Sequence, residues 1–217
     1  MPSKAEENLP ATNEGYGTRE YWEQRYTNEA PDTTFDWFLT PSYLIPIIRE
    51  QTQDIGTSAR VLMLGCGNSA LSEAMYEAGW KNIVNIDYSE KVIQQMSERH
   101  ADKPEMRWQV MDVLDLQFEK ESFDLIIDKG TMDAMLTTKG DPWNPPEKDV
   151  IACTKEVSEA LRVLKKSTTS KFMYFTFGQP HFRRRYLEGR EGSNLTVQEI
   201  GPPEGFAYHM FILSCGD

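Results

Sequence analysis

The sequence predicts an α/β fold with helices on both faces of a mostly parallel sheet and an antiparallel hairpin at the C-terminus. Two observations support this prediction. Five short apolar segments alternate with segments of helical periodicity between about residues 43 and 177, and such alternation makes the strands run parallel. Two further strand-like segments, 195–200 and 207–214, flank the turn Gly201-Pro202-Pro203-Glu204-Gly205, which suits an antiparallel hairpin.

A glycine turn with Gly65 and Gly67 follows the first predicted strand, at 60–64. Glycine has no Cβ, so the backbone can turn tightly and a ligand can lie against it. Ser69 or Ser72 can cap the helix that follows, whose free N–H groups point back at the ligand. This strand, turn and helix are typical of a nucleotide pocket in an open α/β sheet. A tight turn without any ligand is the alternative interpretation.

The second strand, at 82–86, strengthens the ligand interpretation. Asp87 follows it and lies 22 residues after Gly65, close to the offset of roughly 20 residues expected for a carboxylate that binds ribose hydroxyls. Asp87 could also cap the helix that starts near Ser89, and the two roles are compatible. Turn and acid together predict a ligand that contains adenosine.

The remaining elements follow from periodicity and length. We expect further strands at 106–111, 123–127 and 172–177, with helices at 43–51, 71–78, 90–100 and 149–165. Residues 1–14 are predicted to form a flexible tail. Residues 15–217 are predicted to form one domain, because 217 residues are too few for two ordinary domains.

An aromatic segment precedes the first strand. Thr18 can cap a short helix on which Trp22 and Tyr26 share one face. These rings and Trp37 either pack into the core or form a flap over the ligand. Spacing alone favours core packing.

Composition narrows the classes of partner. The formal net charge is −11, which repels phosphate backbones, so we expect no nucleic-acid partner and favour a basic protein or a cationic group. No apolar run approaches the roughly 18 residues that span a membrane, and residues 1–14 have no apolar signal core. The three cysteines include no C-x-x-C pair, so we expect no metal site and a reducing cytoplasmic location. We also expect a monomer.

Seven motifs occur in order from about Gly17 to the C-terminus: EYWEQRY at 20–26, FDWF at 35–38, LGCGNSALS at 64–72, DYS at 87–89, MDV at 111–113, DKGTMDA at 128–134 and PHFR at 180–183. In this combination the chain resembles class I S-adenosylmethionine-dependent methyltransferases. It is most similar to the eukaryotic elongation factor 1-alpha lysine methyltransferase family. The resemblance implies a Rossmann-like seven-stranded sheet, which the C-terminal hairpin also favours over a plain dinucleotide fold.

The resemblance also implies roles for individual residues around S-adenosylmethionine. Gly65 and Gly67 would line its methionine and ribose portion, and Asp87 would bind the ribose hydroxyls, with Tyr88 beside the adenine. Asp112 would accept a hydrogen bond from the adenine amino group, and Val113 would offer its backbone N–H. Lys129 would border the methionine end of the cofactor. Trp22, Tyr26 and Trp37 would cover the ligand. This last implication reverses the preference for core packing.

The implied reaction is methyl transfer to a protein lysine, with elongation factor 1-alpha as the implied partner. In-line displacement at a methyl group depends mostly on positioning, and a dry aromatic pocket favours the neutral amine that must attack. Asp128 and Asp133, after the fourth strand, are candidate catalytic residues that could receive the proton, although either could instead cap a helix or pair with Lys129.

Two interpretations stay open beside lysine methylation. Fold alone does not distinguish a small-molecule methyltransferase from a protein methyltransferase, and a non-catalytic module that binds the cofactor is also compatible with the motifs. A nicotinamide-dependent oxidoreductase is disfavoured by the terminal hairpin and Asp112. His181, beside the basic run 183–185, is either a substrate contact or solvated surface.

Overall fold

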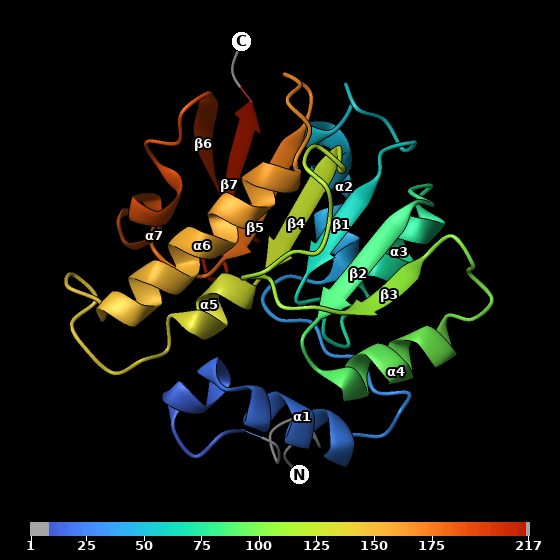
Figure 1. Cartoon of the computed structure of the whole chain (residues 1–217), viewed down its shortest axis with the longest axis horizontal. Helices are drawn as coiled ribbons and strands as arrows, with labels where there is room; N and C mark the ends of the chain where they lie inside the picture. The colour runs from blue at the N-terminus through green and yellow to red at the C-terminus, as the bar shows by residue number, and fades with distance from the viewer. Residues whose placement is uncertain (1–8, 216–217) are drawn as a thin grey trace.

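The computed structural model describes residues 9–215, and within them a seven-stranded sheet has the order β3-β2-β1-β4-β5-β7-β6 (Figure 1). Its strands are β1 (Val61–Leu64), β2 (Ile83–Asp87), β3 (Arg107–Val110), β4 (Leu125–Lys129), β5 (Lys171–Thr176), β6 (Ser193–Ile200) and β7 (Tyr208–Cys215). Neighbouring strands from β3 to β5 pair in parallel, whereas β7 pairs antiparallel with both β5 and β6. The predicted fold class is confirmed.

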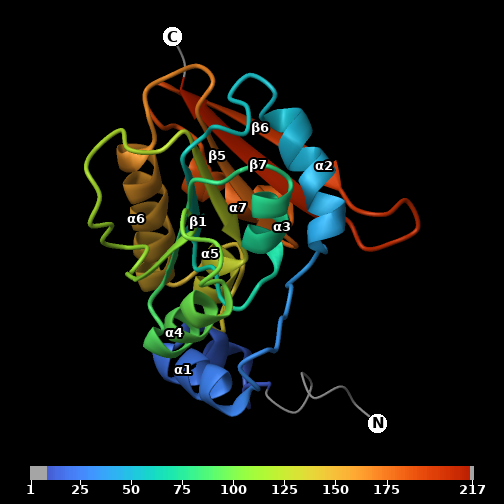
Figure 2. The ribbon, with the colours of Figure 1, turned by 90° about the vertical axis from the view of Figure 1, so that its right-hand side faces the viewer.

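Helices cover both faces of the sheet, with α2 and α3 on one side and α6 on the other (Figure 2). The helical segments of residues 9–215 are η2 (Asn13–Gly17), α1 (Arg19–Asn28), α2 (Pro41–Gln51), α3 (Leu71–Glu77), α4 (Glu90–Arg99), α5 (Thr131–Met135), α6 (Glu147–Val163) and α7 (Pro180–Leu187). None of the described helices is long and apolar enough to span a membrane.

Strand β1 divides the core into two layers. Val61 and Met63 pack with buried residues of α2, α3 and α4, whereas Leu62 and Leu64 pack with buried residues of α6 and α7. Successive side chains of a strand point to opposite faces, and both faces of this parallel sheet are covered, so every residue of β1 is apolar and buried.

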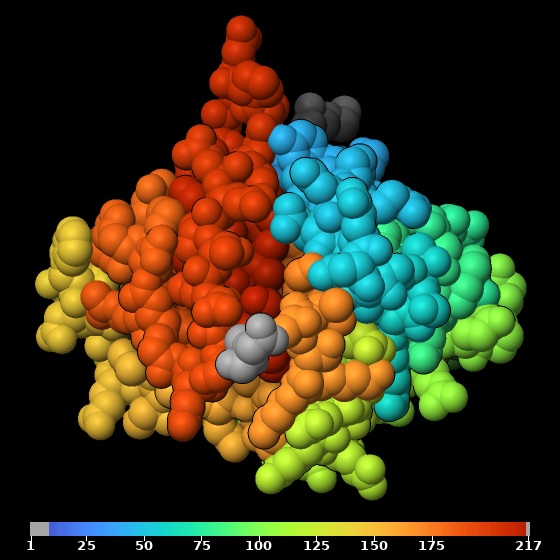
Figure 3. Space-filling model, turned by 90° about the horizontal axis from the view of Figure 1, so that it is seen from above, coloured from blue at the N-terminus to red at the C-terminus, as the bar shows by residue number. Residues whose placement is uncertain are grey.

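The carboxyl ends of the parallel strands meet at one edge of the sheet, which faces α1 at the bottom of Figure 1. The space-filling view from above shows the other end of the molecule, where residues of the first third (blue to cyan) lie beside residues of the last third (orange to red) (Figure 3). Lys171 joins these parts, since its Nζ donates to the Gln51 carbonyl at 2.6 Å and to Asp54 Oδ1 at 2.8 Å.

Several boundaries differ from the prediction. The 3₁₀ helix η2 crosses the expected boundary between tail and domain at residue 14, and residues 1–8 of the expected tail lie outside the described residues. Asp128 and Lys129 belong to β4 rather than following it. The helices α5 and α7 were not predicted from periodicity, because five and eight residues are too few to establish it.

Candidate active site

The glycine turn has the backbone that its sequence requires. Gly65 and Gly67 have φ of 53° and 51°, in the left-handed region that L side chains seldom adopt. A Cβ at Gly65 would lie 2.2 Å from Oγ1 of Thr131, and a Cβ at Gly67 would lie 2.9 Å from the Tyr26 hydroxyl oxygen. Thr131 itself donates to the Leu64 carbonyl at 3.0 Å. The turn is therefore tightly packed between α1 and the start of α5.

Asp87, at the end of β2, joins the turn to α4. Its Oδ2 accepts a hydrogen bond from the Gly67 amide at 3.0 Å, and its Oδ1 accepts one from the Ser89 amide at 2.9 Å. Burial raises the pKa of this carboxyl to about 6, against the lowering effect of the two amides. Each oxygen keeps lone pairs for ligand hydroxyls, so Asp87 both supports the helix start and faces the cavity.

The start of α3 is held by Asp36, from the segment after α1. Asp36 contacts the Ser69 hydroxyl and accepts from the Ala70 amide at 3.3 Å, and Ser69 Oγ accepts from the Leu71 amide at 3.1 Å. The N-cap residue of α3 is Ala70 rather than either predicted serine, and Ser72 is buried and contacts Asn85.

Lys129 lies at the end of β4 with its side chain 6% exposed. Its Nζ lies 3.2 Å from Asp36 Oδ1 and donates to the Trp37 carbonyl at 3.1 Å. Burial lowers the pKa of this ammonium, opposed by Asp36. The lysine therefore fixes the segment with Asp36 and Trp37 against the sheet.

The N-terminal aromatic residues pack against one another and also line the cavity. The rings of Trp22 and Tyr26 stack with centroids 5.8 Å apart, and Trp22 and Trp37 meet edge to face at 6.2 Å. Trp22 Nε1 donates to the Tyr16 carbonyl at 2.7 Å, which ties α1 to η2. Trp22 and Tyr26 of α1, together with Trp37 of the segment that follows, form an aromatic cover over the glycine turn.

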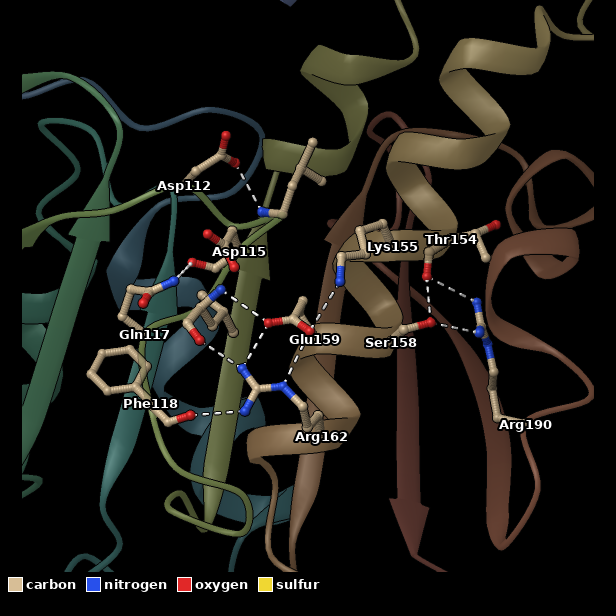
Figure 4. Close-up of polar contacts among 12 residues, drawn as sticks. Asp112, Asp115, Gln117, Phe118, Thr154, Lys155, Ser158, Glu159, Arg162 and Arg190 are labelled. Carbon is tan, nitrogen blue, oxygen red and sulfur yellow. Dashed lines mark hydrogen bonds and ion pairs between the residues drawn. The ribbon is translucent and has the colours of Figure 1, made fainter.

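The loop after β3 forms another wall and is fastened to α6 (Figure 4). Asp112 is exposed and accepts from the Leu114 amide at 2.8 Å. Glu159 accepts from the Leu116 amide at 3.0 Å, while Arg162 donates to the carbonyls of Phe118 and Leu116 at 2.8 and 2.6 Å.

Glu159 and Arg162 of α6 also bind each other at 2.7 Å. The hydrogen bond from Arg162 lowers the pKa of Glu159 to about 2. The sequence analysis missed this pair, although its i, i+3 spacing on a helix was visible.

Asp128 and Asp133 are both engaged in hydrogen bonds. Asp128 is fully buried, does not line the cavity, and accepts from the amides of Thr131 and Met132 at 2.8 and 3.1 Å, so it caps α5. Burial raises its pKa to about 7.

Asp133 lines the cavity but is surrounded by donors. It accepts from the Tyr174 hydroxyl at 2.9 Å, the Thr176 hydroxyl at 2.7 Å and the Arg183 guanidinium at 2.8 Å. Arg183 is therefore an interior partner of Asp133. The sequence analysis named Arg183 only as part of the basic run beside His181 and did not predict this partner.

One cavity of about 1040 Å³ joins these elements. It is lined by every residue assigned to the cofactor from the resemblance: Trp22, Tyr26, Trp37, Gly65, Gly67, Asp87, Tyr88, Asp112, Val113 and Lys129. Ligand pockets typically measure about 300–1,000 Å³, so the volume leaves room for a second reactant. Phe38, Thr131 and Phe177 also line the cavity, and sequence reasoning did not assign them to the site.

Comparisons with known proteins identify the family. Residues 61–142 match the model of a methyltransferase domain. The chain is 35% identical to EEF1A lysine methyltransferase 4 of Bos taurus, over 99% of this chain and 82% of that protein. It is 33% identical to the eEF1A lysine and N-terminal methyltransferase of Bos taurus, over 88% of this chain but only 26% of that longer protein.

A solved structure agrees on the fold. The N-methyltransferase NodS from Bradyrhizobium japonicum, in complex with S-adenosyl-L-homocysteine, is 14% identical with a TM-score of 0.63, over 92% of this chain and 98% of that one. At this identity the likeness shows the fold alone. The 35% identity to the Bos taurus relative extends over nearly the whole chain and therefore shows the family as well as the fold. This chain belongs to the EEF1A lysine methyltransferase family and is an S-adenosylmethionine-dependent enzyme.

Proposed function

We propose that this enzyme transfers a methyl group from S-adenosylmethionine to a lysine side chain of elongation factor 1-alpha, in the cytoplasm. The relatives are named for lysine methylation of that factor. The structural observation that carries the proposal is the extent of the cavity. It runs from Asp87, at the end of β2, past Lys129 of β4 to Phe177 beyond β5, so a second reactant can reach the end of the cofactor opposite the ribose.

The described residues fit the cofactor. Asp87 would accept from the ribose hydroxyls, because each of its oxygens has spare lone pairs, and Asp112 would accept from the adenine amino group. The two glycines keep this wall of the cavity free of side chains, since a Cβ at either position would collide with Thr131 or Tyr26. When bound, S-adenosylmethionine supplies a methyl group on a positively charged sulfur, and the aromatic cover would exclude water from it.

The part of the cavity near Phe38 and Phe177, where the acceptor would bind, favours a neutral amine. A lysine must lose its proton before its nitrogen can attack, and apolar walls such as Phe38 and Phe177 disfavour the charged form. Asp133 carries a negative charge, but Arg183 neutralises it at 2.8 Å. We therefore assign Asp133 to positioning this wall through Tyr174 and Arg183, and Asp128 to capping α5, in place of the proton-accepting roles expected from sequence.

The test is transfer of radiolabelled methyl groups from S-adenosylmethionine into an undermethylated eukaryotic lysate, followed by separation of products by size. We expect a labelled band at the mass of elongation factor 1-alpha, with the label on lysine. Label only in the small-molecule fraction would move the function to a small-molecule acceptor. Cofactor binding without any labelled product would indicate a non-catalytic module.

A further inference from the structure

Four aromatic side chains form a continuous row that leads out of the cavity. Phe177 and Phe38 line the cavity, Tyr208 begins β7, and Phe206 lies in the turn between β6 and β7. The ring centroids of successive members are 5.4, 5.9 and 5.4 Å apart. We call these four residues the aromatic strip.

The strip is exposed at both ends. Phe177 is 45% exposed although it directly follows a buried strand, and Phe206 is 59% exposed. Single exposed apolar residues are ordinary, whereas contiguous exposed aromatic surface marks an interaction site. Aromatic side chains are also enriched where proteins bind each other.

The aromatic strip includes a residue with a strained backbone. Phe38 has a φ of 69°, a region in which a bulky residue is strained and which is often associated with function. Its ring fits because residue 130 is glycine, where a Cβ would lie 3.2 Å from the ring. At the other end, the Gly201 amide donates to the Tyr43 hydroxyl at 3.0 Å, which fastens the hairpin turn to α2.

The strip extends away from the cofactor end of the cavity. Asp87 ends β2, beside β3 at one border of the sheet, whereas Phe177 and Tyr208 belong to the region of β5 and β7 near the other border. The turn that carries Phe206 projects beside α2 (Figure 2). None of the residues assigned to the cofactor belongs to the strip, so its exposed outer end is free for the acceptor.

We propose that the aromatic strip is the docking surface for the protein acceptor, which is a basic protein whose target lysine reaches the cavity across Phe38 and Phe177. This inference rests on the proposed function. The chain carries a net charge of −11, and Glu199 and Glu204 are exposed on the hairpin that holds the outer end of the strip. At the exposed outer end, lysine and arginine side chains of the partner can stack favourably on the face of Phe206.

The test compares two exposed aromatic residues. Phe206→Ala should raise KM for the acceptor protein about tenfold, because aromatic anchors contribute more to binding than most interface residues, while kcat and the Kd for S-adenosylmethionine stay at wild-type values. Trp143→Ala is the matched control, because Trp143 is 66% exposed but stacks on His181 outside the strip. We expect this variant to have wild-type KM.

The outcomes separate this inference from the proposed function. The acceptor in the assay is the protein that the wild-type enzyme labels in lysate, and thermal melting verifies that each variant is folded. A wild-type KM for Phe206→Ala, or a raised KM for Trp143→Ala alone, would overturn the docking surface and leave lysine methylation intact. If the wild-type enzyme labels no protein at all, both proposals fail.

Discussion

Asp87 and the glycine turn depend on each other at the scale of single residues. The carboxylate that would bind ribose also accepts from the amides of Gly67 and Ser89. Asp87→Ala would remove the partner of the buried Ser89 amide and of the half-buried Gly67 amide, and leaving a buried amide unpaired costs about 1–3 kcal/mol. We therefore expect this variant to lose stability together with cofactor affinity, which thermal melting and calorimetry would separate.

Substitution of Gly65 tests the turn. Gly65→Ala places a Cβ 2.2 Å from Thr131 and adds left-handed strain, so we expect the Kd for S-adenosylmethionine to rise at least about tenfold, the effect of roughly 1.4 kcal/mol. Gly56→Ala is the control for strain alone, because Gly56 has a φ of 75° and no atom within 4 Å of its Cβ position. Calorimetric titration should find normal affinity for Gly56→Ala. Normal affinity for Gly65→Ala would remove the turn from the site.

The pKa of Asp87 predicts a pH dependence for cofactor binding. The ionised carboxylate is a much stronger acceptor for the two ribose hydroxyls than the protonated carboxyl, and its pKa in the free enzyme is raised to about 6 by burial. Affinity should therefore be constant above pH 6 and fall by up to about tenfold per pH unit below it. Calorimetry across this range tests the sign, and Asp87→Asn should bind weakly without this dependence. A flat profile for the wild-type enzyme would contradict the role of Asp87.

At the scale of elements, α6 holds the loop that carries Asp112. Glu159 and Arg162 of α6 hold this loop through hydrogen bonds to the backbone of residues 116 and 118 (Figure 4). The hydrogen bond from Arg162 is the main reason why the pKa of Glu159 is lowered to about 2. The stability from this pair is therefore present above the ordinary pKa of 4.5 and is lost as pH falls toward 2.

Glu159→Gln should loosen this loop. The variant keeps one acceptor but loses the charge opposite Arg162, so we expect faster amide hydrogen exchange at Leu116 and weaker cofactor binding. Lys155→Ala is the matched control, since Lys155 lies 3.3 Å from Glu159 but is 52% exposed, and exposed pairs contribute little. Equal exchange rates at Leu116 in wild type and Glu159→Gln would show that the pair does not hold the loop.

The sequence predicted what depends on local pattern. Long helices, buried strands and the hairpin follow from periodicity and turn residues, and the cofactor residues followed from motifs whose positions all reach one cavity. The partners of Asp133 are 41 and 50 residues away, at Tyr174 and Arg183, and no local pattern pairs them. The aromatic strip was missed for the same reason, because its members come from three separate segments.

At the scale of the whole molecule, the N-terminal elements complete the site that the sheet begins. Residues of η2 and α1 line the cavity together with the ends of β1, β2 and β4. The α1 helix lies below the sheet edge in Figure 1 and packs mainly on α4. The sheet and its two core layers do not require η2, since none of its residues is buried.

Removal of η2 should therefore separate folding from binding. A chain that begins at Thr18 lacks Tyr16 and Gly17, which line the cavity, and lacks the carbonyl that Trp22 binds. We expect far-UV circular dichroism close to that of the full chain and a Kd for S-adenosylmethionine raised at least about tenfold. Unchanged affinity would show that η2 is not part of the cofactor site.

Methyl transfer to purified elongation factor 1-alpha tests the central claim most directly. The factor is incubated with the enzyme and S-adenosylmethionine, and its peptides are then examined by mass spectrometry. The account predicts added methyl groups on a lysine, and their loss with Gly65→Ala. An unmodified factor in the presence of an enzyme that binds the cofactor would contradict lysine methylation of this substrate.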